Sequence, residues 1–330
     1  MGRRRLALGG LVRIAVVFPG QGSQGVGMGC DIAASSAAAR AIFDRAAALL
    51  GYDLLALQRS GPEERLRETE FSQPAIFTTN LALYSAAGDG LRPIVTAGHS
   101  FAELCSLVIA DSLSFEEALQ IVDVRAKAMQ AAAQRARGGM SAVLGLDAVA
   151  VRGVLERVRG PDRVGLANFN SPTQIVISGD LDAVERAGQA MLESGAKRVV
   201  PLNVSGAWHS QLMEPAVEPL RKAVEAATFN QPSFDVISNV DGMPYRDVAT
   251  IKSNLIRSVV DEVRWHDTAE RLLEYEPQLI VEFGASGVLS ALFKRMAGRS
   301  DLNRRTMVVS DRAGIESLRD AIAAPTEARA

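Results

Sequence analysis

Cysteine and histidine are scarce in this sequence of 330 residues, which holds two cysteines and three histidines. Two cysteines cannot by themselves make a zinc site or a disulfide framework, and three histidines argue against a histidine-rich metal site. One disulfide between Cys30 and Cys105 is possible, but we expect a pair of buried thiols.

Charge of one sign and long apolar runs are also missing. The formal net charge is −2, and no basic block exceeds the three arginines at residues 3–5, so we expect no nucleic-acid surface. No apolar stretch approaches the length of a membrane-spanning helix. Residues 1–12 lack the apolar core and cleavage site of a secretory signal, and we expect a loose extension in a cytoplasmic protein.

A strand that turns sharply into a helix is predicted around Ser100. The apolar residues 94–97 are typical of a buried strand, and residues 103–110 are typical of a helix. Gly98 and Ser100 at the turn match the nucleophile-elbow pattern G-x-S-x-G in part, with Ala102 in place of the last glycine. Ser100 is thus a candidate nucleophile, and the alternative is a helix-capping serine. His99 should point away from Ser100, and we interpret it as structural.

A glycine-rich loop at residues 19–25 follows the first predicted strand, at residues 13–18. Its spacing fits neither the dinucleotide-binding nor the P-loop pattern. Glycines nevertheless allow a backbone N–H to come close to a ligand. Beside the elbow, the N–H of Gln21 could join that of Phe101, the residue after the nucleophile, in an oxyanion hole.

Two further candidates lie far from Ser100 in the sequence. Arg125 borders the apolar face of a helix predicted to begin at Ser114 and to end at residue 134. Such an arginine is usually a surface charge, and its functional alternative is a fork that grips a carboxylate. His209 follows a turn and is the best general-base candidate. No clear acidic third member accompanies it, which disfavours a simple serine hydrolase.

The remaining pattern predicts an α/β fold with a parallel sheet and an inserted subdomain. Between residues 138 and 202 the order is β-α-β-β-α-β, which is typical of a ferredoxin-like arrangement. We expect a catalytic domain at 13–137 and 203–320 and a subdomain at 138–202. Outside the subdomain, further helices are expected at 31–50, 75–87, 251–260 and 288–296, a strand followed by a turn at 236–242, and a further strand at 279–283.

These motifs together resemble the malonyl-CoA:acyl-carrier-protein transacylase family and the acyltransferase domains of polyketide synthases. The ordered set is specific, although each piece alone is weak. The matching pieces are FPGQGSQ at 18–24, GHS at 98–100, RAKAMQ at 125–130, GM at 139–140, VSGAWHS at 204–210, SNVDG at 238–242 and EFG at 282–284. The resemblance implies an α/β-hydrolase-like core with an inserted ferredoxin-like subdomain.

The resemblance also implies a ping-pong acyl transfer from a malonyl-type acyl-CoA to the phosphopantetheine thiol of an acyl carrier protein. Ser100 would form the acyl-enzyme, and His209 would move the protons. Backbone N–H groups of Gln21 and Phe101 would hold the oxyanion. Arg125 would pair with the malonyl carboxylate. No metal or other cofactor is implied, and we expect a monomer.

Four positions depart from the family pattern, and all four bear on the acyl pocket. Phe101 replaces a smaller aliphatic residue, Ala102 replaces glycine, and Trp208 stands where phenylalanine is usual. Ser258 stands where glutamine is common, but its backbone carbonyl can still orient His209. With Asn239 of the SNVDG motif, Trp208 and Ser258 are our candidates for shaping the pocket and orienting its groups.

Two other functions stay open at this point. A discrete polyketide acyltransferase could take a substituted malonyl-CoA, or an acyl group already on a carrier protein. A non-catalytic docking protein could keep the fold, but intact Ser100, His209 and Arg125 count against it.

Overall fold

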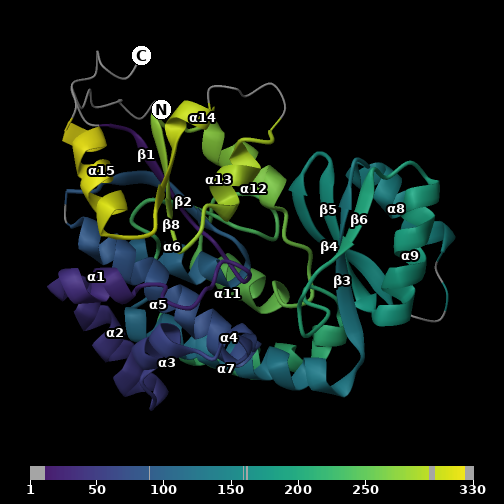
Figure 1. Ribbon diagram of the computed structural model, residues 1–330, viewed down its shortest axis with the longest axis horizontal. Helices are drawn as coiled ribbons and strands as arrows, with labels where there is room; N and C mark the ends of the chain where they lie inside the picture. The colour runs from purple at the N-terminus through teal and green to yellow at the C-terminus, as the bar shows by residue number, and fades with distance from the viewer. Residues whose placement is uncertain (1–11, 89, 159, 161–162, 297–301, 324–330) are drawn as a thin grey trace.

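The computed structural model describes residues 12–88, 90–158, 160, 163–296 and 302–323. The extension expected at residues 1–11 lies outside this part, whereas Val12 is buried in the core rather than loose. The expected α/β fold is confirmed: a five-stranded parallel sheet and a four-stranded antiparallel sheet lie side by side (Figure 1).

The parallel sheet has the strand order β7-β2-β1-β8-β9. Side chains alternate between its faces because successive residues of a strand point to opposite sides. From β1, Val16 and Phe18 pack towards α5 and α6, while Ala15 and Val17 pack towards α12 and α13. Its strands are β1 Ile14–Phe18, β2 Pro93–Gly98, β7 Asp235–Ile237, β8 Leu279–Phe283 and β9 Thr306–Val309.

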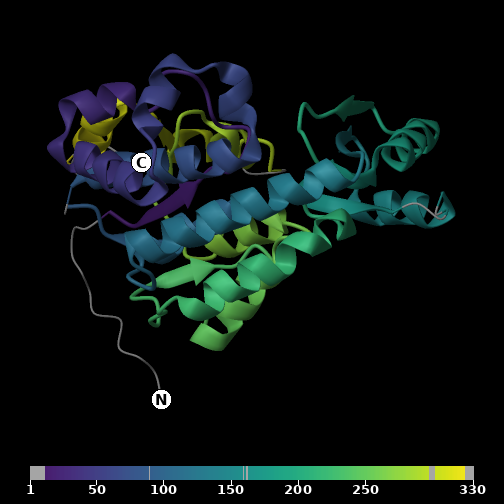
Figure 2. The ribbon, with the colours of Figure 1, turned by 90° about the horizontal axis from the view of Figure 1, so that it is seen from below.

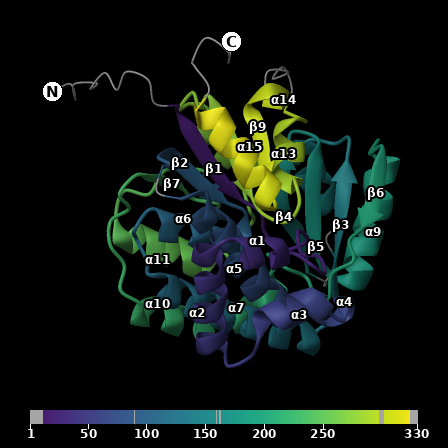
Figure 3. The same cartoon turned by 60° about the vertical axis from the view of Figure 1, so that its left-hand side comes forward.

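Helices cover both faces of this sheet, and α13, α14 and α15 gather beside β9 (Figure 3). The helices before the antiparallel sheet are α1 Cys30–Ser35, α2 Ala37–Leu50, α3 Leu54–Ser60, α4 Glu63–Arg67, α5 Thr69–Ala87, η1 Ser100–Ala102, α6 Glu103–Ile109 and α7 Phe115–Arg135. Those after it are η2 Gln211–Ala216, α10 Val217–Ala226, α11 Val248–Arg257, α12 Trp265–Leu273, α13 Val288–Phe293, α14 Leu302–Arg305 and α15 Arg312–Ala323.

The antiparallel sheet has the order β4-β5-β3-β6, and every adjacent pair is antiparallel. One face packs on α8 and α9 through its own apolar cluster, and the other gives Met140, Ala142 and Val176 to the main core. Its elements are β3 Gly138–Leu144, α8 Ala148–Arg157, β4 Val164–Ser171, β5 Gln174–Asp180, α9 Leu181–Glu193 and β6 Arg198–Pro201. Figure 2 shows α7 running from the main body to this sheet.

Two expected helices differ most from the structure, and the helices expected at 251–260 and 288–296 are observed at Val248–Arg257 and Val288–Phe293. The helix expected at 31–50 is broken at Ser36, whose extended backbone ends α1 and whose side chain accepts a hydrogen bond from the N–H of Ala39 to begin α2. The helix expected at 75–87 begins earlier, at Thr69, and contains Pro74. Its first turn is supported from another helix, because the Gln130 side chain of α7 accepts a hydrogen bond from the N–H of Thr69 at 3.0 Å.

Candidate active site

Three neighbouring strands of the parallel sheet end at the same edge and carry site residues there. The loop with Gln21 follows β1, Ser100 follows β2 and Asn239 follows β7. The register pairs Phe18 with Gly98 and Ala97 with Ile237, so these loops are adjacent. In open α/β sheets, ligands bind outside the carboxyl ends of the strands.

The chain turns sharply at Ser100 between β2 and η1. Ser100 has a φ of 55°, in the left-handed region that non-glycine residues seldom adopt. Gly98 makes the turn possible, because a Cβ at that position would lie 2.0 Å from the carbonyl oxygen of Ala102. Such strain costs about 1–3 kcal/mol and is typical of functional sites.

His209 meets Ser100 across the site. Its Nε2 lies 2.9 Å from the Oγ of Ser100. Its Nδ1 lies 2.8 Å from the carbonyl oxygen of Ser258 and 3.2 Å from that of Asp261. Both carbonyls can only accept, so Nδ1 carries the proton and Nε2 presents its lone pair to Ser100.

His209 is neutral because of its surroundings. Burial lowers its pKa to about 3, with further contributions from Arg125 and His99. An uncharged imidazole with a free Nε2 lone pair can accept the proton of Ser100. Nδ1 faces backbone carbonyls rather than a carboxylate, so this pair lacks the acidic member of a serine-hydrolase triad.

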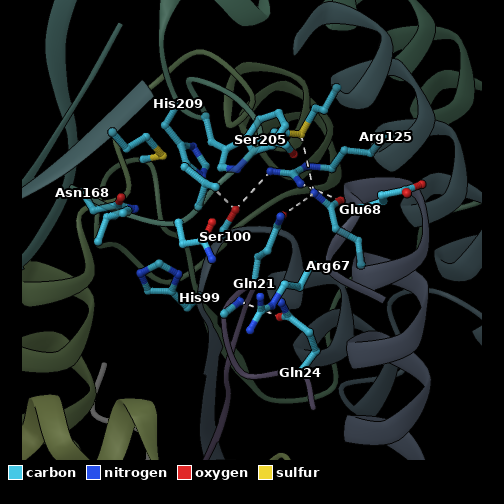
Figure 4. Close-up of a pocket in the computed structure, with 18 of the residues that line it drawn as sticks. Gln21, Gln24, Arg67, Glu68, His99, Ser100, Arg125, Asn168, Ser205 and His209 are labelled. Atoms are coloured by element: carbon cyan, nitrogen blue, oxygen red, sulfur yellow. Dashed lines mark hydrogen bonds between the residues drawn. The ribbon is translucent and has the colours of Figure 1, made fainter. Parts of the chain in front are cut away.

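Arg125 reaches the same oxygen from α7. It is 2% exposed, and its guanidinium donates from Nη2 to the Oγ of Ser100 at 3.1 Å and from Nη1 to the Oε1 of Gln73 at 2.8 Å (Figure 4). Its Nε is buried without a hydrogen-bond partner. Burial lowers the pKa of Arg125 to about 9, and nearby Glu103 opposes that shift. The arginine therefore stays charged at neutral pH.

A cavity of about 480 Å³ opens onto these groups. Ser100 lies in it between His209 and Arg125, and Asn168 lines it from the antiparallel sheet (Figure 4). Met140 of the same sheet lines it as well. Gln21 and Trp208 also line it. The site is thus shared between the two sheets.

The other expected residues take different positions. The Phe101 side chain is buried, with its ring centre 5.8 Å from the Arg125 guanidinium. Ser258 contacts His209 through its carbonyl. Neither Ser258 nor Asn239 is among the residues that line the cavity. Asn239 lies behind the turn instead, where its Oδ1 accepts the N–H of Ser100 at 3.1 Å.

Several residues at the site were not expected from the sequence. Gln73 holds Arg125 and also donates weakly to the side chain of Gln21, at 3.4 Å. Glu103 lies behind the turn. Glu68 and Arg67 line the cavity from a stretch for which we expected no helix. His99 lines the cavity as well, 3.2 Å from the Oδ1 of Asn170. Of these residues only Glu103 gave a signal in the sequence, because it is a charged residue at the start of an apolar helix.

The described ranges hold no group of three His, Cys, Asp or Glu side chains arranged to bind a metal. Every helix in those ranges is too short or too polar to cross a membrane. Cys30 and Cys105 are both free thiols, and Cys105 is buried as expected, whereas Cys30 is only partly buried.

Residues 15–318 match the family model described as acyl transferase domain. A relative from Salmonella typhimurium, named malonyl CoA-acyl carrier protein transacylase, is 40% identical over 288 residues, which are 87% of this chain and 93% of the relative. The structure of a malonyl CoA-acyl carrier protein transacylase from Coxiella burnetii superposes with a TM-score of 0.90 at 34% identity, covering 96% of this chain and 99% of the other. A malonyl-transacylase in complex with a type II PKS acyl-carrier protein superposes with a TM-score of 0.88 at 36% identity, covering 94% and 99%.

Proposed function

This chain belongs to the acyl transferase domain family, and from that premise we propose that it transfers a malonyl group from coenzyme A to an acyl carrier protein. One observation carries the choice of acyl group. A buried, charged arginine lies 3.1 Å from the candidate nucleophile, its two side-chain hydrogen bonds go to the neutral groups of Ser100 and Gln73, and its Nε has no hydrogen-bond partner. A malonyl carboxylate would supply the missing partner.

The first half-reaction forms the acyl-enzyme. The Oγ of Ser100 gives its proton to Nε2 of His209 and attacks the thioester carbonyl carbon. Because Oγ accepts from Arg125, its own proton is free to point at His209. The backbone N–H groups of Gln21 and Phe101 stabilise the oxyanion. The carbon–sulfur bond then breaks, and His209 returns the proton to the coenzyme A thiolate.

The second half-reaction reverses these steps with another thiol. The phosphopantetheine thiol of the carrier protein gives its proton to His209, and its sulfur attacks the malonyl ester. The ester bond to Ser100 breaks, and Oγ recovers the proton from His209. No group other than these side chains, backbone amides and substrates takes part. The names of the relatives favour this reaction over the alternative donors, and it serves fatty-acid or polyketide biosynthesis.

The fold supports a division into two parts. The antiparallel sheet is formed wholly by strands between residues 138 and 201 and has its own apolar cluster with α8 and α9. The order β4-β5-β3-β6 and the β-α-β-β-α-β sequence support a ferredoxin-like subdomain at 138–202. The domain at 13–137 and 203–320 is α/β-hydrolase-like in its strand-turn-helix nucleophile. The monomer and the cytoplasmic location stay predictions.

Intact-protein mass spectrometry tests the nucleophile. Wild-type enzyme incubated with malonyl-CoA should gain the mass of one malonyl group, and Ser100→Ala should gain none because the attacking oxygen is missing. A malonyl adduct on Ser100→Ala would contradict the assignment. No adduct on folded wild-type protein would contradict the proposed donor, and acylated carrier proteins would then be tried.

The Arg125→Ala variant tests the carboxylate clamp. Losing a charge-assisted hydrogen bond of about 1.5–3 kcal/mol should lower kcat/KM for malonyl-CoA about ten- to a hundredfold. Transfer from acetyl-CoA, which lacks the carboxylate, should not fall in parallel. Arg135→Ala, an exposed arginine of the same helix, is the matched control and should leave both donors unaffected. Equal losses for both donors would show that Arg125 does not read the carboxylate.

A further inference from the structure

A buried carboxylate lies behind the turn that presents Ser100. Glu103, in the first turn of α6, is 3% exposed. One of its oxygens accepts a hydrogen bond from the hydroxyl of Tyr245. The other accepts two hydrogen bonds from Asn239, one from the backbone N–H at 2.7 Å and one from the side-chain Nδ2 at 2.6 Å. Tyr245 and Asn239 are themselves 3% and 1% exposed. No step of the proposed reaction uses Glu103.

These contacts determine which way the Asn239 amide points. Its Nδ2 donates to Glu103 and also to the carbonyl oxygen of Gly98 at 2.6 Å. The Gly98 carbonyl can only accept, and the Oε2 of Glu103 is already an acceptor for the backbone N–H of Asn239. Both acceptors therefore require the NH2 end of the Asn239 amide. The Oδ1 end is thereby turned to the N–H of Ser100, which it accepts at 3.1 Å.

The N–H of Ser100 matters because that residue has a left-handed φ of 55°. A hydrogen bond to a fixed acceptor holds the strained backbone in place and with it the Oγ that faces His209. It also directs the N–H of Ser100 away from the oxyanion, so that the N–H of the next residue is the one that the turn presents. If the side-chain amide of Asn239 were not held in this orientation, the backbone of Ser100 could leave its left-handed conformation.

We propose that Glu103 is a positioning residue, which acts through the side-chain amide of Asn239 to hold Ser100 in its reactive backbone conformation. The proposal rests on the proposed function, since it concerns the same nucleophile. Glu103 contacts neither substrate nor reacting atoms. It orients Asn239, and Asn239 holds the N–H of Ser100.

The rate of malonyl transfer to Ser100 and the steady-state kcat and KM test this proposal. Glu103→Met removes the acceptor and should lower the acylation rate and kcat about 10- to 100-fold, in line with the cost of a small misplacement of a reacting group. KM for malonyl-CoA should stay within about threefold, because the cavity and Arg125 remain. Glu103→Gln should stay within about threefold of wild type in rate, since its carbonyl can accept from Asn239 while its NH2 donates to the Tyr245 oxygen.

A double-mutant cycle separates positioning from general damage. Asn239→Ala should lower kcat by a similar factor, and the double variant of Glu103→Met with Asn239→Ala should be no slower than the slower single variant. Glu282→Met is the matched control. Glu282 is also a buried glutamate that accepts two backbone N–H groups, at 2.7 and 3.1 Å, but these belong to α13. Glu282→Met should lower thermal stability and leave kcat unchanged.

The possible results are distinct. If the fold-loss in kcat of the double variant equals the product of the two single losses, the proposal is wrong. A wild-type kcat in Asn239→Ala would overturn it as well. A loss in Glu103→Gln as large as that in Glu103→Met would overturn it too. Glu103→Ala, which leaves room for water, takes the place of Glu103→Met if the latter does not fold. Absence of any malonyl adduct on wild-type Ser100 would instead count against the proposed function.

Discussion

At the scale of single residues, burial sets the chemistry of this site. His209 and Arg125 are both nearly inaccessible, and burial lowers the pKa of each. For His209 this yields a neutral imidazole that can accept a proton. For Arg125 it yields a cation whose charge is retained at neutral pH but poorly solvated, and which therefore gains much from a carboxylate ligand.

The lowered pKa of His209 has a consequence for stability. The folded protein holds this histidine at a pKa of about 3, whereas an unfolded chain would titrate it near its ordinary value of about 6.5. Below that ordinary value the unfolded chain binds a proton that the folded chain does not, so stability falls as the pH falls. At pH 5 the resulting loss in the free energy of unfolding is about 2 kcal/mol.

We expect the His209→Asn variant to lose about 2 kcal/mol less stability than wild type between pH 7 and pH 5. Urea unfolding of both proteins at each pH measures this difference. His99, whose pKa burial lowers to about 4, is present in both proteins and cancels. The same pH dependence in the two proteins would mean that His209 titrates normally when folded.

At the scale of elements, the turn between β2 and α6 depends on close backbone contact. Gly98 leaves no room for a Cβ, which would lie 2.0 Å from the carbonyl oxygen of Ala102 and 2.5 Å from the N of Glu103. These are backbone atoms that cannot rotate away, so the turn itself would have to open. Ala102, which replaces the last glycine of the elbow pattern, is accommodated and fully buried.

Gly98→Ala should therefore destabilise the protein by about 3 kcal/mol and lower kcat with it. Gly165→Ala is the control, because that glycine lies in β4 and a Cβ added to it would have no atom within 4 Å. We expect it to change stability by less than about 0.5 kcal/mol. Thermal and urea unfolding with parallel rate measurements decide the matter, and a neutral Gly98→Ala would mean that the turn is not constrained.

At the scale of the whole molecule, the antiparallel sheet is joined beside the site to the segment that precedes α12. The N–H of Phe169 donates to the carbonyl oxygen of Val263 at 2.8 Å, and the N–H of Val263 donates to that of Ala167 at 2.8 Å. Asn168, between the two β4 residues, lines the cavity. Val263 follows the loop whose carbonyls contact His209. A shift of the antiparallel sheet relative to the parallel-sheet part of the molecule would thus move Asn168 relative to His209.

Comparison of Val263→Pro with Val263→Ala tests this connection. Both lose the buried valine side chain, but only proline removes the N–H that bonds to Ala167. An unsatisfied buried carbonyl costs about 1–3 kcal/mol of stability and would loosen the segment that holds His209. Because a small misplacement of a reacting group can cost up to about a hundredfold in rate, we expect kcat of Val263→Pro to fall about tenfold or more below that of Val263→Ala. Steady-state assays on both folded variants measure the ratio. Equal kcat values would show that the connection does not position the site.

The sequence by itself determined the elements whose signals are local. Apolar runs bounded by glycine located β1, β2 and β8, and the alternation between residues 138 and 202 indicated the order of elements in the antiparallel sheet. The turn chemistry indicated Ser100 and the residue type indicated His209, whereas the role of Arg125 came from the family resemblance. The structure places the Oγ of the serine 2.9 Å from the histidine and 3.1 Å from the arginine. Local signals suffice for the strands and for the turn at Ser100, because a sharp turn or a buried strand depends on residues that are adjacent in the sequence.

Only the tertiary structure decided what depends on partners distant in the chain. The start of α5 at Thr69 rests on Gln130, which no pattern near Pro74 reveals. The second carbonyl that faces His209 and the role of Asn239 behind the turn are likewise contacts across the fold. Glu103 is buried because Tyr245 and Asn239 supply its hydrogen bonds. A sequence shows which groups could form such bonds, but packing alone brings donor and acceptor together.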